Sequence, residues 1–379
     1  MRICIVYDCV YPYTVGGGER WYRELSERLA AAGHEVTYVT LRQWRRGSRP
    51  DLAGVNVVAV APGMRLYAGG RRAIDTQLVF SAATLWHLLR RGGRYDVVQT
   101  AAPHLFFLAV LAARRVRRFR VVADWFEVWT PAYWREYLGP VRGRVGRRIQ
   151  RLCARGEHVA FGLSHLHARR LREEGYRDDP IVLEGTYAGD SAPPAAGEPE
   201  PLVVYAGRHI REKQVPALVP AFARARERVP ELRCEIYGDG PEREEVIRLV
   251  REHSLDGAVA TPGFVDRERV EQAFRHALCL VLPSRREGYG LVVIEACAHG
   301  TPAVVVDGPD NAALELVEDG VNGVVARSAG PEDLAEAILR VHAEGRALRE
   351  STAAWFELNA SRLSLESSVG RVLAAYSGR

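Results

Sequence analysis

The sequence predicts an α/β protein of two doubly wound domains, and three observations support this prediction. Short apolar runs rich in Val and Ile alternate with amphipathic helical stretches, the pattern of parallel sheets covered by helices. The alternation occurs twice, over 1–185 and 202–356, and a Pro-, Gly-, Ala- and acid-rich stretch at 186–201 reads as a linker. A length of 379 residues suits two domains with separate cores.

In the first half, a strand at 2–7 is followed by a loop ending in three glycines and by a helix at 19–32. A glycine loop that opens a helix after a first strand is the phosphate-facing turn of a doubly wound sheet. The full dinucleotide fingerprint is absent, which argues against a nicotinamide or flavin site. Further strands are expected at 36–40, 55–61, 97–100, 121–124, 158–161 and 181–183, and further helices at 74–90, 104–113 and 165–175.

The stretch DWFEVWTPAYWREYLG (124–139) places aromatic rings among carboxylates. Aromatic faces beside acids suit a hydroxyl-rich or amino-sugar ligand, through stacking, hydrogen bonds and cation–π contacts. The alternative is an aromatic core beneath a long loop. The candidate acceptor-binding residues are Asp124, Phe126, Glu127 and Trp129.

A basic amphipathic helix is expected at 139–155. Val141, Val145, Ile149 and Leu152 share one helical face, and six arginines occupy the rest. Such a helix near 141–155 can lie on an anionic membrane, or it can pack its apolar face on its own sheet and leave its arginines in solvent.

In the second half, the segment 278–302 is the most informative. A buried strand at 278–282 stops at Pro283, a polar glycine turn follows, and a helix runs from Leu291 to His299 with Gly300 as its end. The backbone N–H groups of residues 288–291 then lie at a helix N-terminus, where an anion is stabilised. Further helices are expected at 331–343 and 361–376.

Two carboxylates flank this turn. Glu287 and Glu295 are eight residues apart, and a helix of that length rises about 12 Å. They are therefore expected to hold different parts of an elongated ligand and not to share a proton or a metal, unless the loop folds back to the roughly 5–10 Å of a hydrolytic pair.

The composition indicates what class of protein this is. The 47% hydrophobic and 26% charged fractions describe a globular protein, and no apolar run approaches the ~20 residues of a transmembrane helix. The net charge of +5 suits phosphate-bearing ligands and does not argue for nucleic acid. Six scattered cysteines without metal-like spacing favour reduced thiols in a cytoplasmic protein, with the inner face of a membrane as an alternative location. Of the 52 basic residues only Lys213 is a lysine, and the bias towards arginine fits a GC-rich bacterial genome.

The segment PSRREGYGLVVIEA resembles the glutamate, seven residues, glutamate motif of family-4 retaining glycosyltransferases, which have the GT-B fold. The resemblance implies two facing Rossmann-like domains with the site in the cleft, and a last helix, about 357–379, that packs back on the first domain. In that family the first glutamate contacts the donor sugar and the second holds the ribose. GRHIREK (207–213) resembles the family's arginine and lysine turn, whose cations hold the donor diphosphate.

The resemblance therefore implies that Glu287, Arg208 and Lys213 are catalytic and that Glu295 binds the ribose. Arginine grips phosphate bidentately and an ammonium adds a compact charge, which agrees with this assignment. GGGERW resembles the family's opening, whose glycine loop borders donor and acceptor. Further donor contacts are expected from Gly17, Gly18, Gly263, Val265, Gly288, Tyr289, Gly290 and Leu291.

Three positions depart from the family pattern. Gln214 follows the lysine where glycine is usual, Glu184-Gly185 replaces an asparagine-glycine turn, and Phe126 stands where the family has a histidine near donor sugar and acceptor. Phenylalanine cannot donate a hydrogen bond or carry a proton, so a catalytically disabled nucleotide-sugar-binding partner is one alternative. An epimerase or a phosphorylase of the same fold is another.

The expected function is retaining transfer of a sugar from a nucleotide-diphosphate sugar, with a UDP-sugar favoured, to a small polar acceptor such as an aminocyclitol or amino sugar. No cofactor is expected beyond the donor itself. No Asp-any-Asp motif occurs, so cationic side chains and backbone amides are expected to replace a metal. In retaining members of this fold the leaving phosphate is thought to accept the proton of the acceptor.

Overall fold

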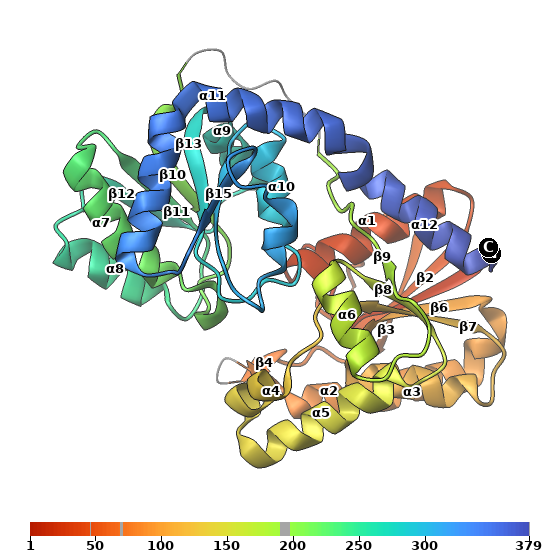
Figure 1. Ribbon diagram of the computed structural model, residues 1–379. Helices are drawn as coiled ribbons and strands as arrows, with labels where there is room; N and C mark the ends of the chain where they lie inside the picture. Colours follow the sequence, from red (N-terminus) through yellow and green to blue (C-terminus); the bar gives the residue numbers. More distant parts are fainter. Residues whose placement is uncertain (46, 69–70, 190–197, 379) are drawn as a thin grey trace. The chain divides into compact units, whose positions relative to one another are not determined.

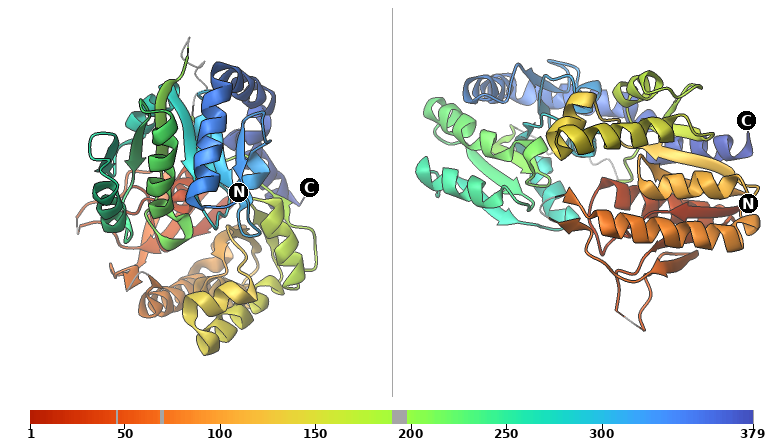
Figure 2. Two further views of the ribbon diagram at one scale, coloured as in Figure 1. Left: turned by 60° about the vertical axis from the view of Figure 1, so that its left-hand side comes forward. Right: turned by 90° about the horizontal axis from the view of Figure 1, so that it is seen from below.

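The computed structural model describes residues 1–45, 47–68, 71–189 and 198–378 (Figures 1 and 2). It contains two compact units, Met1–Glu184 with Glu366–Arg379, and Gly185–Leu365. We call them the N-terminal and C-terminal units. Of the predicted linker 186–201, residues 190–197 lie outside the described residues, and the first strand of the C-terminal unit begins at Glu200.

The N-terminal unit is built on a seven-stranded parallel sheet in the order β3-β2-β1-β6-β7-β8-β9. Ile3, Cys4, Ile5 and Val6 of the central strand are fully buried, as expected for a strand covered on both faces. The strands are β1 (Arg2–Val6), β2 (Glu35–Leu41), β3 (Val55–Ala61), β6 (Val97–Ala102), β7 (Arg120–Trp125), β8 (Val159–Gly162) and β9 (Ile181–Val182), and a separate antiparallel pair is formed by β4 (Tyr67–Ala68) and β5 (Arg71–Arg72).

The direction of each crossover decides which face a helix covers. From β1 the chain moves to β2 on one side, and from β6 it moves through β7, β8 and β9 on the other. Because parallel crossovers are right-handed, the helix after β1 covers one face, and those after β3, β6 and β7 cover the opposite face. The helices are α1 (Gly17–Ala31), α2 (Ile74–Arg91), α3 (Leu105–Arg114), α4 (Pro131–Leu138), α5 (Pro140–Ala154), α6 (His165–Glu173) and α12 (Leu365–Ser377), with a 3-10 turn η1 (Gly92–Arg94).

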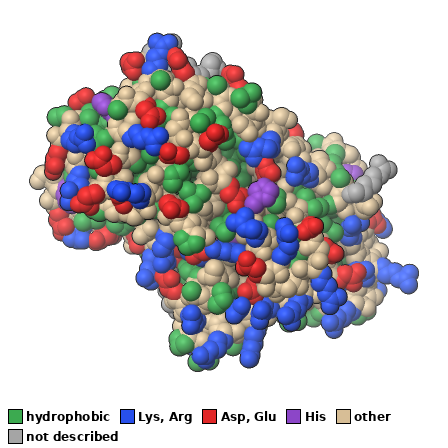
Figure 3. All heavy atoms as spheres, in the orientation of Figure 1, with side chains coloured by type: hydrophobic (Ala, Val, Ile, Leu, Met, Phe, Trp, Pro, Cys, Tyr) green, Lys and Arg blue, Asp and Glu red, His purple; other side chains and the backbone are tan. Residues whose placement is uncertain are grey.

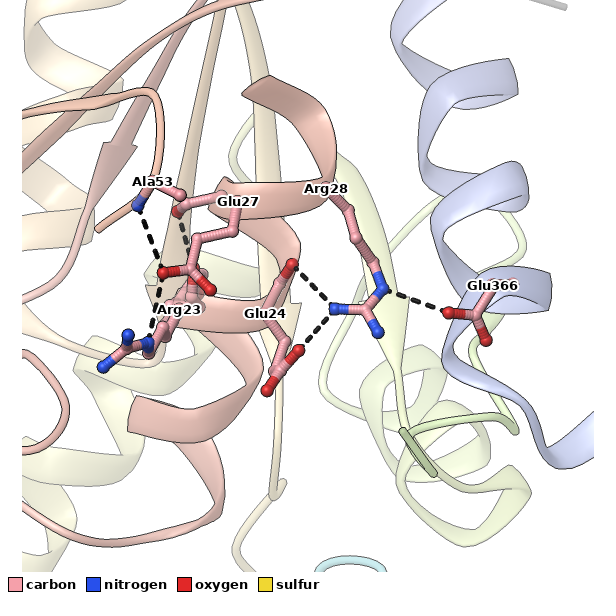
Figure 4. Close-up of polar contacts among 8 residues, drawn as sticks. Arg23, Glu24, Glu27, Arg28, Ala53 and Glu366 are labelled. Atoms are coloured by element: carbon pink, nitrogen blue, oxygen red, sulfur yellow. Dashed lines mark hydrogen bonds and ion pairs between the residues drawn. The ribbon is translucent and has the colours of Figure 1, made fainter. Parts of the chain in front are cut away.

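The last helix, α12, packs within the N-terminal unit. Its Tyr376 hydroxyl donates to Gln99 Oε1 at the centre of the sheet, and Val372 is fully buried. Arg28 of α1 bridges Glu24 and Glu366, the latter at 3.1 Å (Figure 4). Exposed pairs of this kind contribute about 0–1 kcal/mol, so the buried contacts hold the helix.

The C-terminal unit has a six-stranded parallel sheet in the order β12-β11-β10-β13-β14-β15. The strands are β10 (Glu200–Ala206), β11 (Arg233–Tyr237), β12 (Val259–Gly263), β13 (Ala277–Leu282), β14 (Ala303–Val306) and β15 (Gly323–Ala326). The helices are α7 (Leu218–Arg228), α8 (Arg243–Glu252), α9 (Arg267–His276), α10 (Leu291–Cys297) and α11 (Pro331–Leu363), with 3-10 turns η2 (Arg211–Lys213), η3 (Val215–Ala217) and η4 (Ala312–Leu316). The prediction of two parallel-sheet α/β domains is therefore confirmed.

Several helix boundaries differ from those expected. The first helix begins at Gly17, two residues earlier than predicted, and α10 ends at Cys297 and not at His299. The helix predicted over 331–343 forms the first part of α11, and a second helical run follows it to Leu363. Gly345, with a positive φ of 49°, kinks the chain between the two runs. Among the described residues, no helix is long and apolar enough to cross a membrane.

Candidate active site

Most of the predicted donor-binding residues of the C-terminal unit follow β10 and β13. The order in which the chain adds strands to the sheet reverses between these two strands, and we call this place the reversal. The strand order places β10 beside β13, with β11 and β12 on one side and β14 and β15 on the other. Ligands of open parallel sheets bind outside the carboxyl ends of such a pair. Arg208 and Lys213 follow β10 and Glu287 follows β13, so all three lie on loops at the reversal.

Lys213 and Glu287 form a direct ion pair. Lys213 Nζ lies 2.6 Å from Glu287 Oε1, and the side chains are only 18% and 8% exposed. The fully buried Ser284 hydroxyl donates to the same oxygen at 2.9 Å. The only lysine of the chain thus neutralises the carboxylate that the sequence predicts at the donor sugar.

The loop that carries Glu287 is anchored by its neighbours. The N–H groups of Arg285 and Arg286 donate to Glu212 O at 3.0 and 3.3 Å, which connects this loop to the one that carries Lys213. Arg286, 3% exposed, pairs with Asp310 at 3.2 Å. The Glu287 N–H donates to Asp310 O at 3.1 Å, so the carboxylate is positioned before any ligand arrives.

Arg208 lies at the surface beside a buried tyrosine. Its side chain is exposed, and its carbonyl oxygen accepts a hydrogen bond from the Tyr205 hydroxyl at 3.0 Å. Burial raises the pKa of Tyr205 above its ordinary value, the Glu287 charge raises it further, and the Arg208 charge lowers it. The hydroxyl of Tyr205 therefore lies within the electric fields of two of the three predicted catalytic residues, Glu287 and Arg208.

The glycine turn leads into α10 as predicted. Gly290 has a φ of +102°, and a Cβ there would lie 2.8 Å from Ala313 Cβ, so only glycine fits. The Val293 N–H donates to Gly290 O at 2.9 Å, which places Gly288, Tyr289 and Leu291 in or before the first turn. The N–H groups of a first turn have no partner within their own helix and point towards incoming ligands.

Glu295 lies within α10, half-buried, and has a different cationic neighbour. Burial lowers the pKa of Arg267, but the hydrogen bond and charge of Glu271 and the charge of Glu295 raise it above its ordinary value. Glu287 forms an ion pair with Lys213, whereas the charge of Glu295 acts on Arg267. This arrangement agrees with two carboxylates that serve different parts of a ligand.

Gly263 is the last residue of β12 and Val265 follows it, two strands from β10 in the sheet. Gly263 has a φ of +85°, and its carbonyl accepts from the Gly238 N–H at 2.8 Å. Val265 is half-buried. Both lie at the same edge of the sheet as Arg208, because carboxyl ends of parallel strands share one edge.

In the N-terminal unit, Gly18 lies directly against Phe126. A Cβ at Gly18 would come within 2.9 Å of the Tyr7 hydroxyl and 3.4 Å of Phe126, whereas Gly17 has open space. The Phe126 ring is half-buried and meets Tyr22 edge-on, with centroids 5.9 Å apart. The glycine turn and the position of the missing histidine thus form one surface.

Asp124 lies beneath this surface and is not part of it. The carboxyl is 2% exposed, and its Oδ2 accepts from Tyr22 at 2.6 Å and Gln99 at 2.7 Å. Burial raises the pKa of Asp124 to about 7, and the hydrogen bonds from Tyr22 and Gln99 oppose this rise. The sequence places Asp124 among the acceptor ligands, but its partners in the structure are those of a core residue that fixes β7 to α1.

Glu127 and Trp129 contact each other. The Trp129 indole donates to Glu127 Oε2 at 3.0 Å, and Trp129 exchanges backbone hydrogen bonds with the side chain of the fully buried Gln150. The rings of Tyr133, Trp134 and Tyr137 surround Trp129 with centroids 4.6–4.9 Å away. The aromatic stretch is thus a self-packed cluster from which the half-buried Glu127 projects.

Three contributors were not predicted from the sequence: Tyr205, Ser284 and Asp310. Ser284 belongs to the Pro-Ser pair that ends the strand, so its proximity to Glu287 was available from spacing. Tyr205 and Val204 point to opposite faces of a strand, and the sequence pattern does not show that the Tyr205 hydroxyl bonds to the loop that carries Arg208.

These features define a class of protein: two parallel-sheet α/β units in one chain, of the GT-B type of glycosyltransferase. Residues 190–354 match the family model described as glycosyl transferases group 1, and residues 16–183 match a glycosyl transferase 4-like domain. The D-inositol 3-phosphate glycosyltransferase of Kribbella flavida is 30% identical over 360 residues, which span 86% of this chain and 82% of that protein. The chain belongs to the glycosyl transferases group 1 family.

Three further similarities cover less of the relative's length or concern the fold alone. The alpha-D-kanosaminyltransferase of Streptomyces kanamyceticus is 32% identical over 141 residues, 37% of this chain and 36% of that protein. The sucrose-phosphate synthase of Thermosynechococcus elongatus superposes with a TM-score of 0.82 at 21% identity, covering 100% of this chain and 98% of that one. Anabaena HepE in complex with UDP-glucose gives 0.76 at 15% identity, with 100% of each chain covered.

Proposed function

We propose that this glycosyltransferase moves a sugar from a UDP-sugar to a small polar acceptor with retention at the anomeric carbon. The observation that carries the proposal is the Lys213–Glu287 pair at the reversal of the C-terminal sheet, with Arg208 exposed beside it. The structural neighbour HepE holds UDP-glucose, which supports a uridine nucleotide as donor.

The residues divide the donor between them. Arg208 and Lys213 hold the diphosphate, Glu287 holds the sugar and Glu295 the ribose. The bond from the anomeric carbon to phosphate breaks and the bond to the acceptor oxygen forms on the same face, and the acceptor proton moves to the departing phosphate oxygen. The two cations and the amides at the start of α10 stabilise the charge that builds on the diphosphate, so no metal is required.

The acceptor is assigned to the surface made by Gly18, Phe126 and Glu127. Because Asp124 is buried and bonded to Tyr22, Glu127 is the carboxylate that can meet an acceptor. A carboxylate held by Trp129 beside an aromatic ring suits a cationic amino sugar or aminocyclitol. The match to a kanosaminyltransferase fits an amino sugar in the reaction.

Donor identity is tested by thermal shift across nucleotides and nucleotide sugars. A ligand at 100 times its dissociation constant adds about 2.7 kcal/mol to stability. UDP and one UDP-sugar are expected to raise the melting temperature, and transfer to amino-sugar acceptors is then followed by NMR of the anomeric proton. A product of inverted configuration, or stabilisation only by another nucleotide, would refute the proposal.

The acceptor assignment is tested by Glu127→Gln. We expect the KM for the acceptor to rise about tenfold, the loss of one charge-assisted hydrogen bond, with UDP affinity unchanged. Phe126 supplies the second candidate function, a disabled nucleotide-binding partner. A wild-type chain inert with every donor and acceptor that gains transfer on Phe126→His would establish that alternative.

A further inference from the structure

The helix α5 exposes its apolar stripe. Val141, Val145 and Leu152 are 67%, 51% and 60% exposed. The sequence allowed this stripe to pack on the sheet, but in the structure the buried face carries other residues: Gly143, Gly146, Gln150, Cys153 and Ala154.

The buried face is fixed by two glycines against Trp134 of α4. A Cβ at Gly143 would collide with the Trp134 backbone, and a Cβ at Gly146 would collide with its ring. Only glycine permits this close approach of α4 and α5. Rotating α5 to bury its valines would break these contacts, so the outward direction of the stripe is determined by packing.

The helix α2 exposes a second apolar stripe. Ile74, Leu78 and Trp86, spaced at multiples of four residues, are 61%, 56% and 60% exposed. The guanidinium of Arg90 lies 4.5 Å from the centroid of the Trp86 ring. A tryptophan covered by an arginine presents an apolar body and a cation on one surface.

The two stripes lie on helices that cover the same face of the sheet, and both stripes point away from the sheet. The helices α2, α3 and α5 follow crossovers of one direction, and α3 contacts both of the others (Figure 1; Figure 2, right). Val116, two residues after the end of α3, is 68% exposed. Singly exposed apolar residues need no explanation, but here two apolar stripes lie on helices that both pack against α3.

This surface is strongly basic. From 140 to 155 the chain has six arginines and no acid, and α2 has one acid, Asp75, against two arginines. Arg147 and Arg151 pair with the buried Glu174, while Arg142 and Arg148 are exposed. In Figure 3, blue side chains gather with green ones along the lower edge, where Figure 1 places α5.

We propose that the face formed by α2, α3 and α5 docks the N-terminal unit on an anionic membrane surface. Apolar side chains enter the boundary between headgroups and acyl chains, and the flanking arginines meet lipid phosphates. A second copy of the chain fits less well, because a two-fold contact through this face would place arginines against arginines. Nucleic acid would use the arginines but leave both apolar stripes in water.

The test is binding to vesicles, using the full chain. Vesicles of phosphatidylcholine with phosphatidylglycerol are compared with phosphatidylcholine alone by flotation, at low and physiological salt. We expect binding to the anionic vesicles that weakens with salt, and little binding to the neutral ones. Each arginine near such a surface contributes about fivefold to the partition coefficient, so Arg142→Gln with Arg148→Gln should lower it about 25-fold.

The apolar contribution is tested by Val145→Glu with Leu152→Glu, which should lower binding at least tenfold. Leu358→Glu, at an 86% exposed leucine in the C-terminal unit, is the matched control and should bind as the wild type does. Since all three leucine and valine positions are exposed, the melting temperature should not change. Equal binding by the double variant and the control would overturn the proposal, as would a dimer in solution that Val145→Glu dissolves.

Discussion

The ion pair between Lys213 and Glu287 leads to a prediction in which two single substitutions have opposite effects. In the structure the ammonium is held by the carboxylate at 2.6 Å. In the proposed reaction the ammonium serves the diphosphate and the carboxylate serves the sugar. Nucleotide must therefore compete with Glu287 for Lys213, and a donor sugar must share Glu287 with it.

The size of the pair's contribution follows from its burial. At an effective dielectric constant of 20, the attraction at this distance is about 6 kcal/mol before the cost of removing both charges from water. A hydrogen bond between charged groups contributes a net ~1.5–3 kcal/mol. Lys213→Ala leaves Glu287 with only Ser284, so the free energy of unfolding should fall by about 2 kcal/mol and the melting temperature of the C-terminal unit by roughly 4–8 °C.

Titration calorimetry with UDP, which lacks the sugar, separates the two roles. Lys213→Ala should weaken UDP binding about tenfold or more and lower turnover about 10²–10³-fold, and Lys213→Arg should restore only part of either. Glu287→Gln should also lower turnover, but UDP should bind about fivefold more tightly because one hydrogen bond to Lys213 no longer competes.

The control is a surface pair in the same unit. Arg228 and Glu336 are 64% and 70% exposed at 3.2 Å, so Arg228→Ala should change stability by less than about 1 kcal/mol and leave UDP binding intact. Equal loss of UDP affinity in Lys213→Ala and Glu287→Gln would show that the pair acts only as a structural unit. Wild-type turnover in Lys213→Ala would remove the lysine from the site.

Three further predictions concern metal, pH and backbone strain. Transfer should survive EDTA; loss of activity that Mg²⁺ or Mn²⁺ restores would contradict the proposed leaving-group site. Asp124 has a pKa of about 7 in the folded protein against its ordinary 3.8, so the folded state retains a proton that the unfolded state loses, and the free energy of unfolding falls as pH rises from about 4 to 7. Asp124→Asn should flatten that fall in urea unfolding at pH 4.5 and 8, and an unchanged slope would count against the buried network. Gln214 has a φ of +49°, so Gln214→Gly should be neutral or stabilising by up to about 1 kcal/mol with transfer retained, whereas Gln214→Val should destabilise; the reverse order would contradict the assigned conformation.

The conformation of Gln214 also explains a departure visible in the sequence. The family usually has glycine at this position, and the structure shows a left-handed residue between two 3-10 turns. The sequence alone shows that glutamine replaces the usual glycine. It does not show that this position has a left-handed backbone, because a residue type does not determine φ. The same limit applies to Phe126, whose neighbour Gly18 comes from more than a hundred residues earlier.

The alternation of strands and helices was predictable because each buried strand is a continuous apolar run, and the two motifs around Lys213 and Glu287 were predictable because their spacing is local. The spacing of residues in the sequence does not show which distant residue each side chain contacts in the fold. Asp124 looks like a ligand beside aromatic residues, and only the sheet shows that Tyr22 and Gln99 hold it in the core.

The helix α5 shows most clearly why a sequence can predict a helix correctly and still not predict which face of it is buried. Its apolar stripe has helical periodicity, and periodicity alone would turn that stripe inward. Gly143 and Gly146 form a second, flatter face on the same helix, and Trp134 of the preceding helix fills it. Because Trp134 packs directly against the backbone of these glycines, the small residues take the interior and Val141 and Val145 remain outside. The exposed stripe and the arginines around it are the two features on which the proposed docking to an anionic membrane rests.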